Sequence, residues 1–275
     1  MTTKEEDGIM RIRYCQTHDN ILFFTNKGKV YQTKAYEIDE SSRTSKGTAV
    51  INLINIESGE KVESFITYNK NDEFKYVFLA TRNGTVKKTA KTEFENIRRS
   101  GIVAIKLERG DELSWSNPTT GNDDILVYTR NGKSIRFHEK AARPLGRATM
   151  GVRGIKLTSD DKVVGMDVVT KGSSPMLLTI MENGYGKKTL IKEFKAQSRG
   201  GQGVKIAEVN VKTGKVASSQ IIPPASKEVI ITSLKGQVVK LDIDGVPKLT
   251  RATQGVILMR FSKEGDGVAA ITCVE

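Results

Sequence analysis

Basic side chains that recur beside glycine residues are the groups in this sequence with the clearest chemical potential. One set lies next to glycines that separate two apolar segments, and a second set lies next to glycines further along each copy of the same pattern. Nucleic acid carries one negative charge per phosphate, so cations repeated at intervals can neutralise successive phosphates. The chemistry that this pattern predicts is electrostatic binding of a polyanion.

The candidate contacts fall into two groups according to the glycine that they accompany. The first group is Lys27, Lys29, Arg82, Lys87, Lys88, Arg130, Lys133, Arg136, Lys187, Lys188, Lys235 and Lys240. The second group is Arg43, Lys46, Arg98, Arg99, Arg147, Arg153, Arg199, Lys205 and Arg251. An arginine precedes each second glycine, and it could contact phosphate or hydrogen-bond loop carbonyl groups; both roles stay open. Gly200 and Gly201 are further candidates, because a backbone without Cβ can approach phosphate closely.

The overall charge agrees with a polyanionic partner. Lys and Arg number 44 against 32 Asp and Glu, a formal net charge of +12, which favours nucleic acid first and an anionic membrane second. No apolar run approaches the roughly 18 residues of a spanning helix, and no signal-peptide pattern opens the chain. Cys15 and Cys273 lie near opposite ends, which argues against a disulfide framework or a zinc site. We expect a protein of the cytoplasm without membrane contact.

Catalysis finds little support in the residue types. The chain has two histidines, His18 and His138, and neither belongs to an HExxH motif. No GxSxG or Walker loop occurs, and the glycines at 200–203 lack the Lys-Ser/Thr and the helix that a phosphate loop needs. The acidic pairs at 123–124 and 160–161 lie in turns without histidine. We therefore expect neither an enzyme nor a bound metal or cofactor.

The elements that position these cations repeat five times, at a period of about fifty residues. Each copy opens with an apolar strand, a turn ending in glycine and a second strand. The turn glycines are Gly28, Gly84, Gly132, Gly184 and Gly236. Asn-Gly or Lys-Gly between β-branched or aromatic runs predicts a β-hairpin with a two-residue type I′ turn.

Each copy continues with a second glycine and two further strands, which gives four strands per unit. The second glycines are Gly47, Gly101, Gly151, Gly203 and Gly255. Four-stranded units of this length fit an all-β, propeller-like array; two β-sandwiches are the alternative, against which the even period and the missing linker argue. We expect one domain over 1–275, with repeats at about 9–61, 62–112, 113–163, 164–215 and 216–267, and 268–275 as a closing or leftover strand of a partial sixth.

The sequence resembles the C-terminal domain of the DNA gyrase A subunit over essentially its whole length, with the A subunit of topoisomerase IV as the next most similar family. The resemblance lies in the segments 4–7, 17–19, Phe24–Tyr31, Asn83–Thr89, 92–94, Gly151–Ile155, Asn183–Thr189 and Thr253–Ile257. It implies a β-pinwheel, a propeller variant in which neighbouring blades exchange strands, with duplex DNA bent around a basic rim.

The resemblance also implies the partners and the setting. The domain would be a non-catalytic part of an ATP-dependent type II topoisomerase, joined to the N-terminal part of the gyrase A subunit and working with the gyrase B subunit. Strand cleavage in that family uses a tyrosine in a separate N-terminal domain. The isolated domain is expected to be monomeric. A protein-interaction scaffold is the alternative function, and steep weakening by salt would distinguish DNA binding from it.

One departure from the family concerns its signature box of Gln, basic, Arg, Gly, Gly, basic, Gly, which is tied to DNA wrapping. The most similar segment here is Gln197–Gly203, in which Ser198 and Gln202 stand where the family has basic residues. We interpret it as a degenerate copy that shapes a blade loop. The chain is expected to begin just after the position at which the family carries the box.

Overall fold

The computed structural model describes residues 15–42, 47–69, 71–173 and 175–274. In this part of the chain, the regular elements are nineteen β-strands and five short 3-10 helices. The strands form five antiparallel sheets, four with four strands and one with three. The expected all-β fold of four-stranded, propeller-like blades is therefore confirmed. The chain divides into two compact units.

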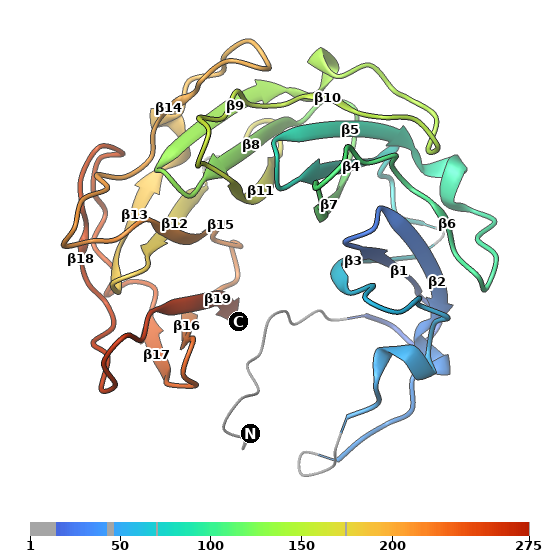
Figure 1. The fold of residues 1–275 in the computed structure, drawn as a ribbon, viewed down its shortest axis with the longest axis horizontal. Helices are drawn as coiled ribbons and strands as arrows, with labels where there is room; N and C mark the ends of the chain where they lie inside the picture. Colours follow the sequence, from blue (N-terminus) through green and yellow to red (C-terminus); the bar gives the residue numbers. More distant parts are fainter. Residues whose placement is uncertain (1–14, 43–46, 70, 174, 275) are drawn as a thin grey trace. The chain divides into compact units, whose positions relative to one another are not determined.

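The first unit, within residues 15–123 and 139–154, contains two sheets. The first has the order β3-β1-β2-β6, with β1 (Asn20–Thr25), β2 (Lys29–Lys34), β3 (Val62–Tyr68) and β6 (Ile102–Val103). The second has the order β10-β5-β4-β7, with β4 (Tyr76–Thr81), β5 (Thr85–Ala90), β7 (Leu113–Thr119) and β10 (Val152–Arg153). Its 3-10 helices are η1 (Ala35–Glu37), η2 (Val50–Asn52), η3 (Lys91–Phe94) and η4 (Glu139–Ala141). Figure 1 shows β4 between β5 and β7.

The second unit, within residues 124–138 and 155–274, contains three sheets and η5 (Ile191–Glu193). The third sheet is β11-β8-β9-β14, with β8 (Asp124–Thr129), β9 (Lys133–His138), β11 (Val163–Val169) and β14 (Val204–Lys205). The fourth is β15-β12-β13-β18, with β12 (Met176–Met181), β13 (Tyr185–Leu190), β15 (Val216–Ile221) and β18 (Val256–Ile257). The fifth is β17-β16-β19, with β16 (Glu228–Ser233), β17 (Val238–Asp242) and β19 (Val268–Val274).

The hairpin turns lie where the sequence predicts them, but their type differs. Gly28 has φ +75°, and its N–H donates to the carbonyl oxygen of Thr25 at 2.9 Å. Among the described residues no non-glycine has positive φ, whereas a type I′ turn needs positive φ at both central positions. Asn26 and Lys27 therefore form a type I turn, and Gly28 follows as a glycine bulge.

Successive blades exchange a short strand. β6 follows the β4–β5 hairpin in sequence, yet it pairs with β2 of the preceding hairpin through Lys29–Val103 and Val30–Ile102. In the second unit β14 likewise follows β13 and pairs with β9, and β18 follows β17 and pairs with β13. This exchange is the feature that distinguishes a β-pinwheel from an ordinary propeller.

The long strand of each blade corrects the expected repeat boundaries. β3 pairs with β1 along its whole length, and β19 pairs with β16 in the same way, with Ile231 opposite Ile271. Each sheet thus joins a hairpin to the long strand that follows it, so the repeats are displaced by one strand from the expected divisions. Val268–Val274 is the third strand of the fifth sheet, where we expected a closing or leftover strand of a partial sixth repeat.

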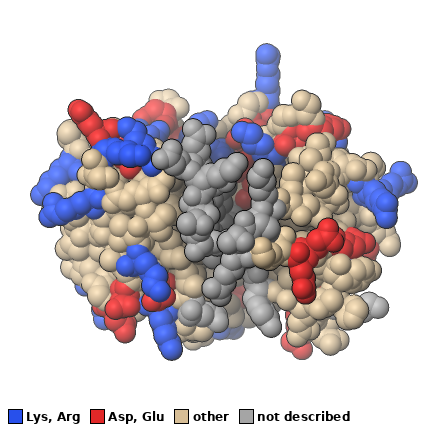
Figure 2. Space-filling view, turned by 90° about the horizontal axis from the view of Figure 1, so that it is seen from below, with Lys and Arg blue, Asp and Glu red and all other residues tan. Residues whose placement is uncertain are grey.

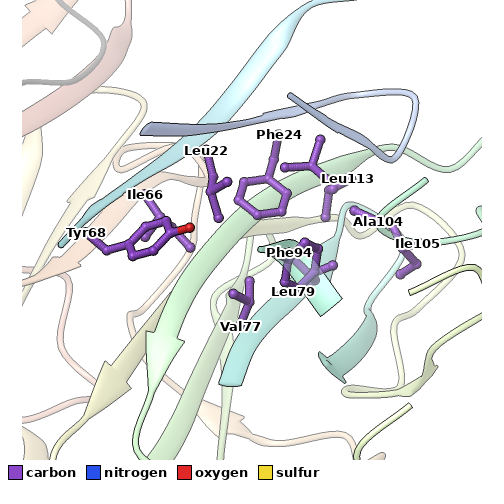
Figure 3. Close-up of a cluster of buried hydrophobic side chains, with 11 residues drawn as sticks. Leu22, Phe24, Ile66, Tyr68, Val77, Leu79, Phe94, Ala104, Ile105 and Leu113 are labelled. Carbon is purple, nitrogen blue, oxygen red and sulfur yellow. The ribbon is translucent and has the colours of Figure 1, made fainter. Parts of the chain in front are cut away.

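Alternating apolar residues of neighbouring sheets form the core of each unit. In the first unit, β1 contributes Leu22 and Phe24, β4 contributes Val77 and Leu79, and η3 contributes Phe94, all of them buried (Figure 3). The rings of Phe24 and Phe94 meet edge to face at 6.0 Å. Burying each such side chain stabilises the fold by about 1.5–3 kcal/mol. The core therefore ties the first sheet to the second and fixes the loops between them.

Candidate nucleic-acid interface

Several of the cations beside the hairpin turns lie close to carboxylates. Lys29 is 2.5 Å from Glu57, and Lys27 is 4.0 Å from the same carboxylate. Lys240 is 2.8 Å from Glu228. Lys235 donates instead to the backbone carbonyl oxygen of Glu264. Exposed pairs of this kind add at most about 1 kcal/mol to stability, but they reduce the positive charge that the turn presents to a polyanion.

The arginines of two hairpin turns are compensated in the same way. Arg82 lies 3.0 Å from Glu112 and 3.4 Å from Glu63. Arg130 donates two hydrogen bonds to one oxygen of Glu182, at 2.7 and 2.9 Å. Figure 2 shows Lys and Arg mixed with Asp and Glu over the face in view. The hairpin turns therefore carry much less net charge than the sequence suggests.

A second group of cations lies near the short exchanged strands β6, β10, β14 and β18, each of which forms one edge of its own sheet. We call this edge of a sheet the exchange edge. Arg98 and Arg99 are exposed just before β6, and Arg153 is exposed on β10. Lys133 and Lys205 are exposed and directly opposite one another on β9 and β14. Like charges in that position repel, so positive charge accumulates where β9 and β14 pair.

Arg251 joins two neighbouring exchanged strands in the second unit. It precedes β18, and its guanidinium group donates to the backbone carbonyl oxygen of Lys205 on β14 at 3.0 Å. The ammonium group of Lys205 lies 3.1 Å from Glu208. Arg251 therefore makes the carbonyl contact expected for a structural arginine while adding its charge beside Lys133 and Lys205. Of the two roles left open by the sequence, the structure shows the carbonyl contact for this residue.

Four of the predicted phosphate contacts are buried, so the prediction is wrong for them. Lys87 and Lys187 are 0% exposed, Lys88 is 3% exposed and Lys188 is 5% exposed. Each ammonium group donates to backbone carbonyl oxygens inside the protein. A buried amine enclosed by carbonyl groups does not reach a phosphate at the surface, so these four lysines are structural.

Lys87 and Lys187 hold equivalent loops. Lys87 donates to the carbonyl oxygens of Ala104 at 2.9 Å, Thr149 at 3.0 Å and Arg147. Lys187 donates to those of Thr250, Arg251 and Thr253 at 2.7 to 2.8 Å. Burial lowers the pKa of Lys87 to about 8; the carboxylate of Glu93 opposes this shift. Burial lowers the pKa of Lys187 to about 8 as well, against the opposing effect of Glu193.

Lys88 and Lys188 anchor other segments. Lys88 donates to the carbonyl oxygen of Glu139 at 3.0 Å, and the buried carboxylate of Glu139 lies 3.7 Å away. Burial lowers the pKa of Lys88, while Glu139 acts to raise it. Lys188 donates to the carbonyl oxygen of Ile243 at 2.6 Å. These contacts are separate from the loops that Lys87 and Lys187 hold.

The other predicted contacts divide between structure and surface. Arg136 is half-buried and pairs with Asp124 at 2.8 Å, a structural contact. Arg147 is partly exposed and lies 3.7 Å from Glu93. Arg199, Gly200 and Gly201 are partly exposed, and Gly200 has φ +83°. Arg43 and Lys46 lie outside the described residues.

Two cations and two carboxylates beside these loops were not predicted from the sequence. Lys106 and Lys156 are exposed and each follows a second glycine by the same number of residues, a recurrence that would have identified them. Glu93 and Glu193 face the buried lysines and stand before Phe94 and Phe194 in the two copies that carry a Lys-Lys pair. Comparing those two copies would have indicated them.

The described part of the chain has neither a candidate metal cluster nor a candidate membrane-spanning helix. Within it, no group of three or more His, Cys, Asp or Glu side chains is arranged to hold a metal ion. None of the described helices has the length and apolar character needed to cross a membrane.

The sequence matches a family model described as "DNA gyrase C-terminal domain, beta-propeller", in five segments: 19–69, 75–119, 123–170, 175–223 and 227–275. The chain is 39% identical over 268 residues to the DNA gyrase A subunit of Staphylococcus epidermidis, an alignment that covers 97% of this chain and 30% of that protein. Identity to the Staphylococcus aureus protein of the same name is 39% over 265 residues, 96% of this chain and 30% of that one. The chain thus spans about a third of the length of these relatives.

Solved structures of two related domains share the fold. The C-terminal domain of DNA topoisomerase IV aligns with a TM-score of 0.86 at 23% identity, over 100% of this chain and 84% of that one. A DNA gyrase A C-terminal domain aligns with a TM-score of 0.79 at 21% identity, over 98% and 90%. Each of the five matched segments runs from a hairpin to the long strand that follows, as the sheets do. The chain therefore belongs to the DNA gyrase A C-terminal domain family.

Proposed function

We propose that this chain binds duplex DNA through its phosphates and bends it, as a non-catalytic accessory domain of a type II topoisomerase of the gyrase kind. The observation that carries this proposal is the match to the gyrase C-terminal domain model in all five repeats. The exchange edge supports it independently, because exposed or partly exposed cations lie near the exchanged strand of each four-stranded sheet. The whole chain, 1–275, would act as one DNA-binding domain.

The mechanism that this arrangement allows is electrostatic. Bending duplex DNA requires contacts at successive phosphates along a curved surface and no recognition of bases. We assign the phosphate contacts to the exchange edge, where the exposed or partly exposed candidates gather: Arg98, Arg99, Lys133, Arg147, Arg153, Lys205 and Arg251, with Arg199 and the backbone of Gly200 and Gly201. The hairpin cations would add long-range attraction, weakened by their carboxylate partners.

The proposed partners come from the kind of protein that the relatives are. Because the chain corresponds to about 30% of a gyrase A subunit, we propose that it works beside the N-terminal part of that protein and, in the holoenzyme, the gyrase B subunit. We also propose that the isolated chain is a monomer and that it acts in the cytoplasm. Supercoiling would be the task of the assembled enzyme, with this domain supplying bent DNA.

The test is binding to linear duplexes of increasing length across a salt series, followed by relaxation and religation of plasmid in the presence of the protein. A binding constant that falls with a logarithmic slope of about −0.9 per phosphate neutralised is expected, together with a shift in topoisomer distribution. Salt-sensitive binding without a topoisomer shift would indicate DNA binding without wrapping. Binding absent at low salt would overturn the proposal and leave a protein-interaction scaffold.

A further inference from the structure

Two buried lysines have no part in phosphate contact and occupy positions where a charge is costly. Counting from the hairpin glycine, the position of Lys87 and Lys187 is held by Tyr31 and Ile135 in two other copies, both buried. Burying an ammonium group is unfavourable unless hydrogen bonds compensate for lost hydration. Three backbone carbonyl groups at each lysine supply that compensation.

The carbonyl groups come mainly from a loop with the same local sequence in both places. The loop is Arg147–Gly151 in one case and Arg251–Gly255 in the other, each reading Arg-Ala-Thr-x-Gly. The threonine hydroxyl closes each loop by donating to a carbonyl three residues earlier, at 2.7 Å for Thr149 and 2.9 Å for Thr253. Each loop is thus held both by a hydrogen bond of its own threonine and by hydrogen bonds from the buried lysine.

Each loop begins with an arginine of the exchange edge, Arg147 or Arg251. The lysine binds the arginine's own backbone carbonyl oxygen, at 2.7 Å between Lys187 and Arg251. The side chain of Arg251 is directed to the carbonyl oxygen of Lys205, and that of Arg147 lies beside Glu93. The backbone of each arginine is therefore hydrogen-bonded to a buried ammonium group.

We propose that Lys87 and Lys187 are positioning residues for DNA: each holds the backbone of an Arg-Ala-Thr-x-Gly loop so that Arg147 or Arg251 meets a phosphate, although neither lysine touches DNA. This inference rests on the proposed function. The loops before β6 and β14 lack this support, because they face Tyr31 and Ile135 instead of a lysine.

The test is a double-mutant cycle on DNA binding, with Lys87→Met, Arg147→Ala and the double variant compared with the wild-type chain. If Lys87 acts through Arg147, removing Arg147 weakens binding and lowers the salt slope by about 1 in the wild type, but changes little in the Lys87→Met background. Independent effects that simply add would overturn the inference. Lys187→Met with Arg251→Ala provides a second, separate cycle.

The matched control is Lys88→Met, which removes the neighbouring buried lysine of the same strand. Its ammonium group binds Glu139 and leaves the Arg147 loop alone, so its effect on binding should add to that of Arg147→Ala. Coupling of equal size for Lys88 would overturn the inference, because any destabilisation of the blade would then produce the result. If the wild-type chain itself failed to bind DNA, the proposed function would fail first.

A second measurement needs no variant. Amide hydrogen exchange of the wild-type chain should show the loops at 147–151 and 250–255 more protected than those at 98–101 and 199–203, because only the former rest on an ammonium group. Equal protection in both pairs would contradict the inference even if Lys87→Met were too unstable to study.

Discussion

The ammonium group of Lys187 lies 2.7 Å from the backbone carbonyl oxygen of Arg251. The first residue is 0% exposed, and the second reaches the surface beside Lys205. A buried charge and a surface charge are thus joined through a single peptide group. Residues that shape the exchange edge are therefore distinct from the residues proposed to meet the ligand.

Cations of the exchange edge should contribute more to DNA affinity than those of the hairpin turns. Arg98→Ala removes an exposed arginine that forms none of the ion pairs among the described residues, and it should lower the salt slope by about 1. Arg130→Ala removes an arginine already paired with Glu182 and should lower it less. Fluorescence anisotropy over a salt series checks both; equal slopes would disprove the ranking.

Relieving the charge repulsion between Lys133 and Lys205 should raise the stability of the fold but lower its affinity for DNA. Lys133→Gln removes one of two like charges that are opposite each other, so the free energy of unfolding should rise by about 0.2–1 kcal/mol. DNA affinity should fall. Urea unfolding and DNA titration measure the two effects. Lys240→Gln, which breaks the pair with Glu228, is the comparison and should not raise stability.

Alkaline pH should stabilise the fold through Lys87 and Lys187. Their folded pKa is about 8, below the ordinary lysine value of about 10.4. Between these values the unfolded chain binds protons that the folded chain has released. The free energy of unfolding therefore rises with pH in this window, by up to about 1.4 kcal/mol per pH unit for each lysine.

The measurement for that pH effect is urea unfolding from about pH 7.5 to about 10.5, a range that spans the folded and unfolded pKa values, for the wild type and for the double variant Lys87→Met, Lys187→Met. The charged groups facing the two amines are Glu93 with Arg147 and Glu193 with Arg251. The difference between the two proteins isolates the lysines from all other titrations. A difference that stays constant with pH would show that their pKa values are ordinary.

Substituting Gly203 should disrupt the pairing of β14 with β9. Gly203 has φ +71°, and a Cβ there would collide with the carbonyl oxygen of Ser134. Gly172 has φ +83° with open space around it, so Gly172→Ala measures the backbone strain alone, about 1–2 kcal/mol. Gly203→Ala should cost more than that in urea unfolding. Equal losses of unfolding free energy in the two variants would mean that β14 can shift away from β9 without further loss of stability.

Much of the fold was predictable because its signals are local. Asn-Gly and Lys-Gly between apolar runs located every hairpin, and Gly28 has the positive φ that the turn needs. The exchanged strands could not be predicted from the residues alone, because a two-residue strand such as Ile102–Val103 is too short to show a periodic pattern. The partner of β19 was equally hidden, because alternation in Val268–Val274 does not say which hairpin it joins.

The candidate site was predicted less well, for a physical reason. A lysine in a strand is ordinarily solvated, and the carbonyl groups that enclose Lys87 come from Ala104, Arg147 and Thr149, far along the chain. One signal was available: Tyr31 and Ile135 at the equivalent position mark it as part of the core. The carboxylates beside Arg82 and Arg130 were not predictable, because sequence distance hides them.

Strand exchange gives the domain a direction. β2 is completed by β6 from the next copy, and β13 by β18, whereas no earlier copy supplies a strand to a later one in the sheets of the described residues. Losing a copy from the C-terminal side therefore leaves its predecessor with an unpaired edge, while losing one from the N-terminal side leaves its successor's hydrogen-bond ladder intact. Unfolding should propagate unequally along the chain, and fraying should advance from the C-terminal copy towards the first.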